Sequence, residues 1–129
     1  MPHLQIQYSS NLDAVLDMAQ LCDRLNELMC ASELFPTGGV RVRAIPTSAF
    51  SIADKHPKNA FIDMVLRIGI GRTAEQKQEI GQALIDQVSQ TCAPLLQEPH
   101  FALSLEILEI NPEFSWKVNS IHPRLKKQQ

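Results

Sequence analysis

Residues 60–73 read AFIDMVLRIGIGRT, and this stretch sets the pattern of the chain. The part up to Ile70 is long, apolar and rich in residues that favour strands, so we predict a central strand of a sheet. Thr73 and Gln76 match the capping box that opens a helix. Residues 101–110 alternate between apolar and polar side chains and predict a further strand. The helix between the two strands has one apolar face, formed by Ile80, Leu84, Val88 and Cys92.

The first half of the chain repeats this plan. Residues 2–8 alternate and predict a half-buried strand, with Pro2 at the first position, where a strand tolerates proline. Asn11 is predicted to cap a helix, and residues 40–45 predict the next strand, after turn residues that include two glycines. The apolar face of this helix is predicted to carry Leu12, Val15, Leu16, Ala19, Cys22, Leu25, Leu28 and Met29.

These two halves predict an α+β (α/β) fold within a single domain of residues 1–129. A helix that links two strands of one sheet normally makes a right-handed parallel crossover, so each half should be a βαβ unit, at about 2–48 and 60–112. Two such units form a four-stranded sheet with two helices on one face. No further helix is predicted to cover the other face, and association with identical chains would cover it.

Composition excludes several classes of function. The chain has 129 residues, 44% of them hydrophobic, and a formal net charge of −2, which argues against general nucleic-acid binding. No segment has the length of a membrane span, and the start lacks the pattern of a signal peptide. The three cysteines form no C-x-x-C pair and are predicted to be reduced, which favours a cytoplasmic protein. The four histidines lack ligand-like spacing, so no metal site is predicted. The basic residues 124–127 are predicted to form a solvated tail.

Three residues are candidates for chemistry. If Met1 is removed, Pro2 carries a free secondary amine, whose pKa burial or a nearby cation would bring toward the working pH of a general base. Arg72 precedes a helix N-terminus, where a cation is disfavoured, so it is predicted either to capture a carboxylate or to lie in solvent beyond the cap. Arg41 shares a strand face with Arg43, a face that is either the solvent side or one covered in an oligomer.

Several phrases of the sequence resemble the tautomerase superfamily and, within it, the 5-carboxymethyl-2-hydroxymuconate delta-isomerase family. They are the Pro2 start, residues 35–43 (FPTGGVRVR), residues 68–73 (IGIGRT), residues 103–107 (LSLEI) and residues 117–122 (KVNSIH), in this order over essentially the whole chain. The phrase at residues 71–77 (GRTAEQK) also resembles the short 4-oxalocrotonate tautomerases, in which each unit begins with a catalytic proline. Here the second unit begins at Ala60, inside the chain, so one catalytic amine is expected.

The resemblance implies an isomerase, a keto-enol tautomerase, of an unsaturated 2-hydroxy di- or tricarboxylate such as 5-carboxymethyl-2-hydroxymuconate, in the breakdown of an aromatic acid. It implies a homotrimer with no metal and no organic cofactor, in which Pro2 is the general base and proton shuttle. Arg41 and Arg72 would bind the substrate carboxylates, and Arg43 and His3 are lesser candidates.

Aromatic side chains are candidates for the walls of the substrate site. Phe114 and Trp116 lie in the segment that closes the site in relatives, and Phe35 and Phe50 are further candidates, although each ring would also suit core or interface packing. Two other functions stay open. One is hydration or dehalogenation of an unsaturated acid, which needs Asp63 or Glu106 to face the site, and the other is a non-catalytic binding module.

Overall fold

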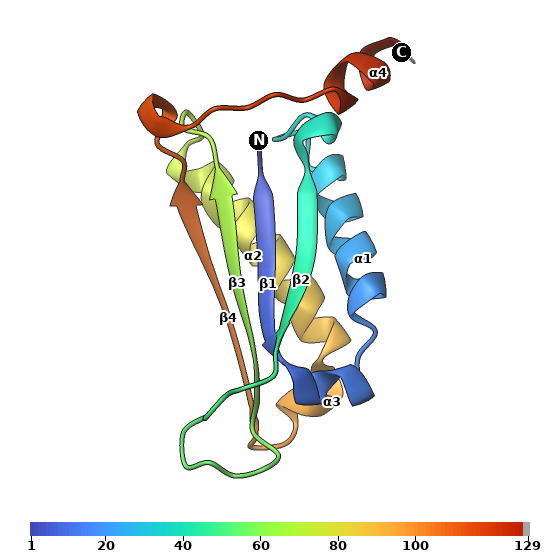
Figure 1. Ribbon diagram of the computed structural model, residues 1–129, viewed down its shortest axis with the longest axis vertical. Helices are drawn as coiled ribbons and strands as arrows, with labels where there is room; N and C mark the ends of the chain where they lie inside the picture. The colour runs from blue at the N-terminus through green and yellow to red at the C-terminus, as the bar shows by residue number, and fades with distance from the viewer. Residues whose placement is uncertain (128–129) are drawn as a thin grey trace.

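The computed structural model describes residues 1–127, so the last two residues of the predicted domain lie outside the described range. Four strands form one sheet in the order β2-β1-β3-β4 (Figure 1). Within each half the two strands are parallel, and the central strands β1 and β3 are antiparallel, with His3 opposite Arg67. The prediction of two parallel βαβ units in one four-stranded sheet is confirmed. The strands are β1 (His3–Ser9), β2 (Arg41–Thr47), β3 (Ala60–Ile68) and β4 (Phe101–Glu109).

The two long helices, α1 (Met18–Ala31) and α2 (Ala74–Thr91), lie on the same face of the sheet (Figure 1). A core of fully buried side chains lies between the helices and the sheet. These side chains come from every second residue of the central strands and from one face of each helix, as their periodicity predicts. It includes Leu4, Ile6, Ile62, Met64, Leu66, Leu25, Met29, Leu84 and Val88. The opposite face of the sheet has no helix over it (Figure 1) and presents polar side chains such as Gln7, Asp63 and Arg67.

The starts of the two helices differ in how well the sequence predicts them. At α2 the capping box is confirmed, since Thr73 Oγ1 accepts from Gln76 N at 3.1 Å and Gln76 Oε1 accepts from Thr73 N at 2.9 Å. The prediction that Asn11 caps the first helix is wrong. Residues Ser10–Ala14 form a short 3-10 helix, η1, and α1 begins later, with Asp17 Oδ1 accepting from Gln20 N at 3.0 Å. The intervening turn shifts the helical face, so Val15 is 62% exposed.

The C-terminal part of the chain crosses one end of the sheet. After β4, a 3-10 turn η3 (Pro112–Phe114) leads into an extended segment that passes over the ends of β3, β1 and β2 and ends in helix α4 (Ile121–Lys127) (Figure 1). The solvated tail predicted for residues 124–127 is therefore helical. The start of α4 contacts η2 (Thr37–Gly39), where a Cβ on Gly38 would lie 2.7 Å from His122 Nδ1. The absent side chain permits this contact.

Two connections complete the chain. Residues 48–59 form the long loop at the other end of the sheet, and the short helix α3 (Ala93–Leu96), which begins next to Pro94, follows α2 there. Within residues 1–127, no helix combines the length and the apolar character that crossing a membrane requires.

Candidate active site

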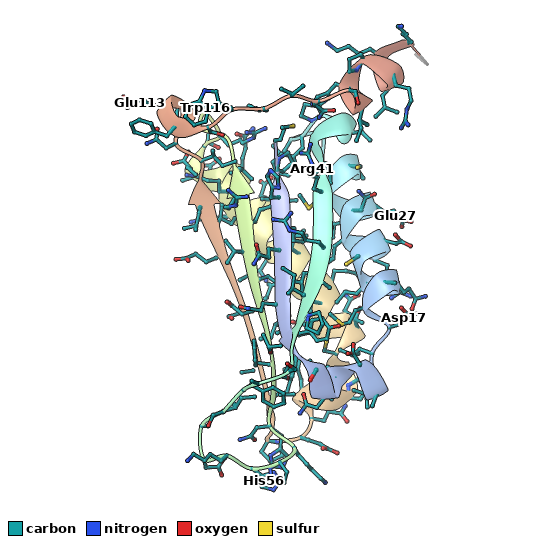
Figure 2. All side chains as sticks on the ribbon, viewed as in Figure 1. Asp17, Glu27, Arg41, His56, Glu113 and Trp116 are labelled. Atoms are coloured by element: carbon teal, nitrogen blue, oxygen red, sulfur yellow. The ribbon has the colours of Figure 1, made fainter. Side chains whose placement is uncertain are left out.

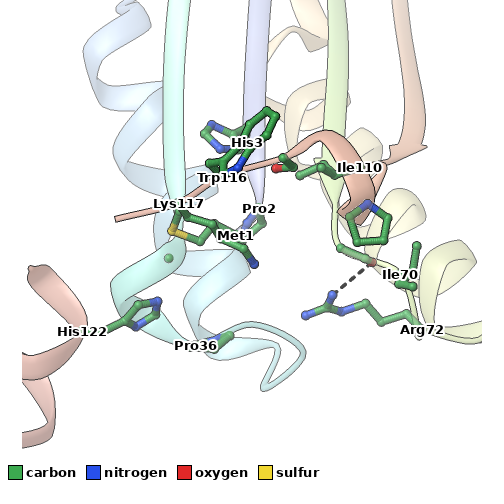
Figure 3. Close-up of a pocket in the computed structure, with 14 residues that line it drawn as sticks. Met1, Pro2, His3, Pro36, Ile70, Arg72, Ile110, Trp116, Lys117 and His122 are labelled. Carbon is green, nitrogen blue, oxygen red and sulfur yellow. Dashed lines mark hydrogen bonds between the residues drawn. The ribbon is translucent and has the colours of Figure 1, made fainter. Parts of the chain in front are cut away.

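A pocket of about 430 Å³ opens at the N-terminal end of β1 (Figure 3). The sheet topology explains why distant segments meet here. Because β1 and β3 are antiparallel, the end of β3 lies beside the start of β1, and the parallel pairing of β1 with β2 adds the turn before β2. The crossing segment after β4 forms the remaining wall. The pocket is thus lined by residues 1–3, 36 and 39, 69, 70 and 72, 110, 112 and 115–117, and His122.

Pro2 lies at the centre of this pocket. It is buried, and its carbonyl accepts from Arg41 N at 3.1 Å, which fixes it against the start of β2. In the chain with Met1, the Pro2 nitrogen is part of a peptide bond and is not a base. Met1 itself occupies the pocket, where its Sδ lies 3.3 Å from Arg41 Nη1 and 3.2 Å from Asn119 Nδ2. Removal of Met1 would expose the Pro2 amine and release both of these donors.

The electrostatic environment of the N-terminus is positive. Burial first, and then the charges of Lys117, Arg72 and Arg41, lower the pKa of the N-terminal ammonium from its usual 8.0. The pKa of His3 is lowered as well, by burial and then by the neighbouring arginines. Among the described residues that line the pocket there is no aspartate and no glutamate. A concave site with positive charges and no carboxylate favours an anionic ligand.

Arg72 is held at the edge of the pocket by the protein itself. Its Nη1 donates to Gly69 O at 3.2 Å and its Nη2 to Leu34 O at 2.9 Å. The guanidinium carbon lies 5.0 Å from the centre of the Phe35 ring, which is only 4% exposed. A guanidinium has five N–H donors, so this arrangement fixes its plane and still leaves donors for a ligand.

Arg41 lies at the start of β2, close to Pro2, although its side chain is not part of the pocket lining while Met1 is present (Figure 2). Its Nη1 also donates to Gly39 O at 3.3 Å. Neither Arg41 nor Arg72 has a carboxylate within salt-bridge distance among residues 1–127, where the ion pair found joins Lys77 and Glu109 at 3.7 Å. Arg43 lies two residues further along β2, and its Nη1 is 3.3 Å from His3 Nδ1. The two arginines predicted to bind carboxylates therefore have no acidic partner in this part of the chain.

The four aromatic candidates are placed very differently. Phe35 lies beneath Arg72, and Trp116 lines the pocket although 86% of it is exposed. Phe114 is 67% exposed in η3, next to the pocket but not in its lining. Phe50 lies in the loop 48–59, in a shallow hollow with His56 at the opposite end of the sheet (Figure 2 labels His56). Within one chain the structure does not bring Phe50 to Pro2.

Sequence reasoning missed three polar residues of the crossing segment. Lys117 and His122 line the pocket, and Asn119 anchors the segment through a bond from its Nδ2 to Gly38 O at 2.9 Å. Asn119 Oδ1 also accepts from the backbone of Ile121 at 2.7 Å and of His122 at 3.2 Å, at the start of α4. The sequence did contain a clue to these residues, the phrase at residues 117–122. It was used only as part of the family resemblance, and no role was predicted for its side chains.

Two parallel βαβ units fused into one sheet, with a proline at the start of the first strand, define the tautomerase superfamily as the class of this protein. The sequence matches the family described as 5-carboxymethyl-2-hydroxymuconate isomerase over residues 2–125. It is 32% identical to the 5-carboxymethyl-2-hydroxymuconate Delta-isomerase of Escherichia coli over 126 residues, 98% of this chain and 100% of that protein. The chain belongs to the 5-carboxymethyl-2-hydroxymuconate isomerase family, a family of isomerase enzymes.

Solved structures agree with this assignment. A 5-carboxymethyl-2-hydroxymuconate isomerase from Deinococcus radiodurans R1 superposes with a TM-score of 0.90 at 36% identity, covering 96% of this chain and 93% of that one. A further structure of a 5-carboxymethyl-2-hydroxymuconate delta-isomerase gives a TM-score of 0.88 at 31% identity, covering 97% and 93%. The resemblance found in the sequence is therefore confirmed at the level of the family.

Proposed function

We propose that this protein is a cofactor-independent isomerase of an unsaturated 2-hydroxy di- or tricarboxylate such as 5-carboxymethyl-2-hydroxymuconate. The observation that carries the proposal is the pocket around the chain's N-terminus, which contains cations and no carboxylate among its described lining residues. Such a pocket suits a polyanion, and it surrounds the position at which processing would create an amine. In this proposal one residue of the pocket, Pro2, carries out the proton transfer.

In the proposed mechanism, the neutral amine of Pro2 takes the proton of the substrate's 2-hydroxyl group. The electron pair of the O–H bond forms the C2 carbonyl, the double bonds shift along the chain, and a proton is delivered to C5 from the Pro2 ammonium. Proton transfer by a positioned group contributes about 10²- to 10⁴-fold. Arg41 and Arg72 would bind substrate carboxylates and stabilise the negative charge of the dienolate as it forms.

The placement of the acidic residues favours isomerisation over hydration or dehalogenation. Activation of water would require a carboxylate near the amine. Asp63 and Glu106 instead lie exposed in the middle of the sheet, where Asp63 Oδ1 accepts from Ser104 Oγ at 2.7 Å, and neither lines the pocket. A non-catalytic binding module has no specific feature of the structure in its favour.

We infer that three copies associate through the face of the sheet without helices, as in the homotrimer implied by the sequence resemblance. Apolar side chains there, such as Ile45 and Leu108, are 39% and 42% exposed beside charged residues. Light scattering should give a particle of three times the chain mass of 14.5 kDa. A monomer at micromolar concentration would contradict this arrangement. Breakdown of an aromatic acid and a cytoplasmic location remain proposals that rest on the family and on the reduced cysteines.

Replacement of Pro2 by Ala tests the proposed base. The reaction is followed by the loss of the dienol substrate's ultraviolet absorbance. We expect kcat to fall by about 10²- to 10⁴-fold with little change in KM, because the amine transfers the proton and does not bind the carboxylates. The intact mass of the active protein should lack one methionine residue. A fully active protein that retains Met1, or a Pro2→Ala variant with normal kcat, would contradict the proposal.

A further inference from the structure

We propose that Lys117 binds the third carboxylate of the substrate, the one on the carboxymethyl arm, and thereby makes the enzyme prefer a tricarboxylate to the corresponding dicarboxylate. This inference rests on the proposed function, and it assigns to the crossing segment a role in substrate selection.

The position of Lys117 is the first argument. It lines the same pocket as Pro2 and Arg72, and its positive charge is among the causes, after burial, that lower the pKa of the Met1 amine. In Figure 3, Lys117 and His122 appear on one side of Pro2 and Arg72 on the other. Within residues 1–127 no carboxylate pairs with Lys117, and its side chain is exposed. A ligand that enters the pocket can therefore reach this charge without breaking an ion pair.

The anchoring of the segment is the second argument. Lys117 is in an extended stretch with no helix or strand of its own, yet Asn119, two residues later, is tied to Gly38 O and caps α4. Val118, which follows Lys117, is 99% exposed and does not line the pocket, whereas Trp116, which precedes it, is 86% exposed and forms part of the pocket wall. The Asn119 side chain therefore holds the backbone of this segment beside the pocket, while the ammonium group of Lys117 stays free to move.

The number and type of the cations near Pro2 match the three carboxylates of the substrate. Muconate carries two carboxylates, and the carboxymethyl substituent in the family's name adds one more, so the substrate is a trianion at neutral pH. Arg72 and Lys117 line the pocket with Pro2, and Arg41 lies beside Pro2 at the start of β2, so three cations lie near the proposed base. An arginine fork suits a carboxylate held in the plane of a conjugated chain, whereas a lysine is a point charge on a flexible stem. The lysine therefore suits the carboxymethyl group, which rotates about a single bond.

The test compares two substrates in matched variants. In Lys117→Met, measured on the high-pH plateau of each protein so that the amine is neutral in both, kcat/KM for 5-carboxymethyl-2-hydroxymuconate should fall by about 10- to 100-fold, the usual effect of losing a bond between charged groups, and kcat/KM for 2-hydroxymuconate should change by less than about threefold. Lys117→Arg should keep most of the preference. Lys126→Met removes the same charge from α4 outside the pocket and should act like the wild type on both substrates. Equal losses on both substrates, or none on either, would overturn the inference.

A binding measurement separates this inference from the proposed activity. Calorimetry with tricarballylate and glutarate, which cannot be isomerised, should show tighter binding of the tricarboxylate by at least about tenfold, and Lys117→Met should abolish the difference. A wild-type protein that isomerises neither substrate but shows this lysine-dependent preference would refute only the proposed function. A wild-type protein without the preference, or a preference that survives Lys117→Met, would refute the role of Lys117.

Discussion

The two ends of the sheet are built from equivalent segments but differ in chemistry. Pro2 and Ala60 are the first buried positions of their units, and each lies beside the segment that follows the central strand of the other unit. At the Pro2 end this neighbouring segment ends in Arg72. At the Ala60 end it is η1, whose Asn11 donates to Asn59 O at 2.9 Å. The fold therefore offers two similar positions, and within residues 1–127 it is the one at Pro2 that combines the chain's first residue with Arg72 and Lys117.

The loop 48–59 explains why no free amine can form at the Ala60 end. It continues directly into β3, so the nitrogen at Ala60 is a peptide nitrogen that donates to His100 O at 2.8 Å. The hollow there has about 270 Å³, against about 430 Å³ at Pro2, and it contains Glu98 as well as Lys58. The βαβ repeat therefore supplies a similar frame at both ends, and the proposed site would need in addition a free amine at Pro2 and the unpaired positive charges around it.

Of the four changes that compare the two ends, Arg72→Ala should produce the largest loss. We expect kcat/KM to fall by about 10- to 100-fold, because a charged hydrogen bond to a substrate carboxylate is lost. Arg24→Ala, which removes an exposed arginine of α1, is the matched control and should be near normal. Comparable kinetics in the two variants would show that Arg72 has only its structural contacts with Gly69 and Leu34.

The pH dependence of activity should report the positive surroundings of the amine. Burial and then Lys117 lower the pKa of the Met1 amine from 8.0, and we expect the same surroundings to lower the pKa of the Pro2 amine after Met1 is removed, so that its neutral form persists to lower pH. We expect kcat/KM to be level at pH 8 and to fall by about tenfold per pH unit below the amine's pKa. His3→Gln should leave this acid limb in place. Disappearance of the limb in that variant would assign it to His3 instead.

Asn59→Ala tests the opposite end, where the prediction concerns stability. The Asn59 side chain is 8% exposed, and it donates to Ile52 O at 3.0 Å and to Asp54 Oδ1 at 2.8 Å, while Oδ1 lies 3.2 Å from His100 Nδ1. Its loss should lower the free energy of unfolding by about 1–3 kcal/mol. Urea unfolding measures this change, with the exposed Gln78→Ala as control. A kcat/KM altered more than about twofold would contradict the separation of the two ends.

Phe35→Leu should have the smallest effect. It keeps an apolar side chain beneath Arg72 but removes the ring, whose interaction with a cation is worth about 0.5–2 kcal/mol. We expect kcat/KM to fall a few-fold, through KM. Phe50→Leu, a change of the same kind at the far end, should leave kcat/KM unchanged. A loss in Phe50→Leu would mean that the loop of a neighbouring subunit reaches the pocket.

The sequence predicted well what depends on local periodicity. The face of α2 with Ile80, Leu84 and Val88, and the capping box at Thr73, follow from neighbouring residues alone, and each is present. Asn11 does not cap α1, because the chain first turns through η1. Asp17, which follows that turn, provides the side-chain oxygen that caps the helix. Two acceptable caps lie close together, and tertiary packing decides between them.

The candidate site was only partly predictable, because its members lie far apart in the sequence. Pro2 and Arg72 meet through the antiparallel pairing of β1 with β3, a relation that the sequence analysis left unspecified. Lys117 and Asn119 lie in a stretch without periodicity, and their place beside Met1 depends on contacts with the turn before β2. Phe50 was expected at the site on aromatic character alone, which does not indicate the end of the sheet to which a loop belongs.

The close contact at Gly38 has a consequence for how sequences of this kind can change. A Cβ at position 38 would lie 3.0 Å from the backbone nitrogen and Cα of His122, so no rotation of the His122 side chain could make room. A substitution of Gly38 is therefore tolerable only if the backbone at residue 122 moves with it. No substitution at position 122 removes these backbone atoms, so a glycine at position 38 should mark the homologues that hold their C-terminal segment over the start of β1.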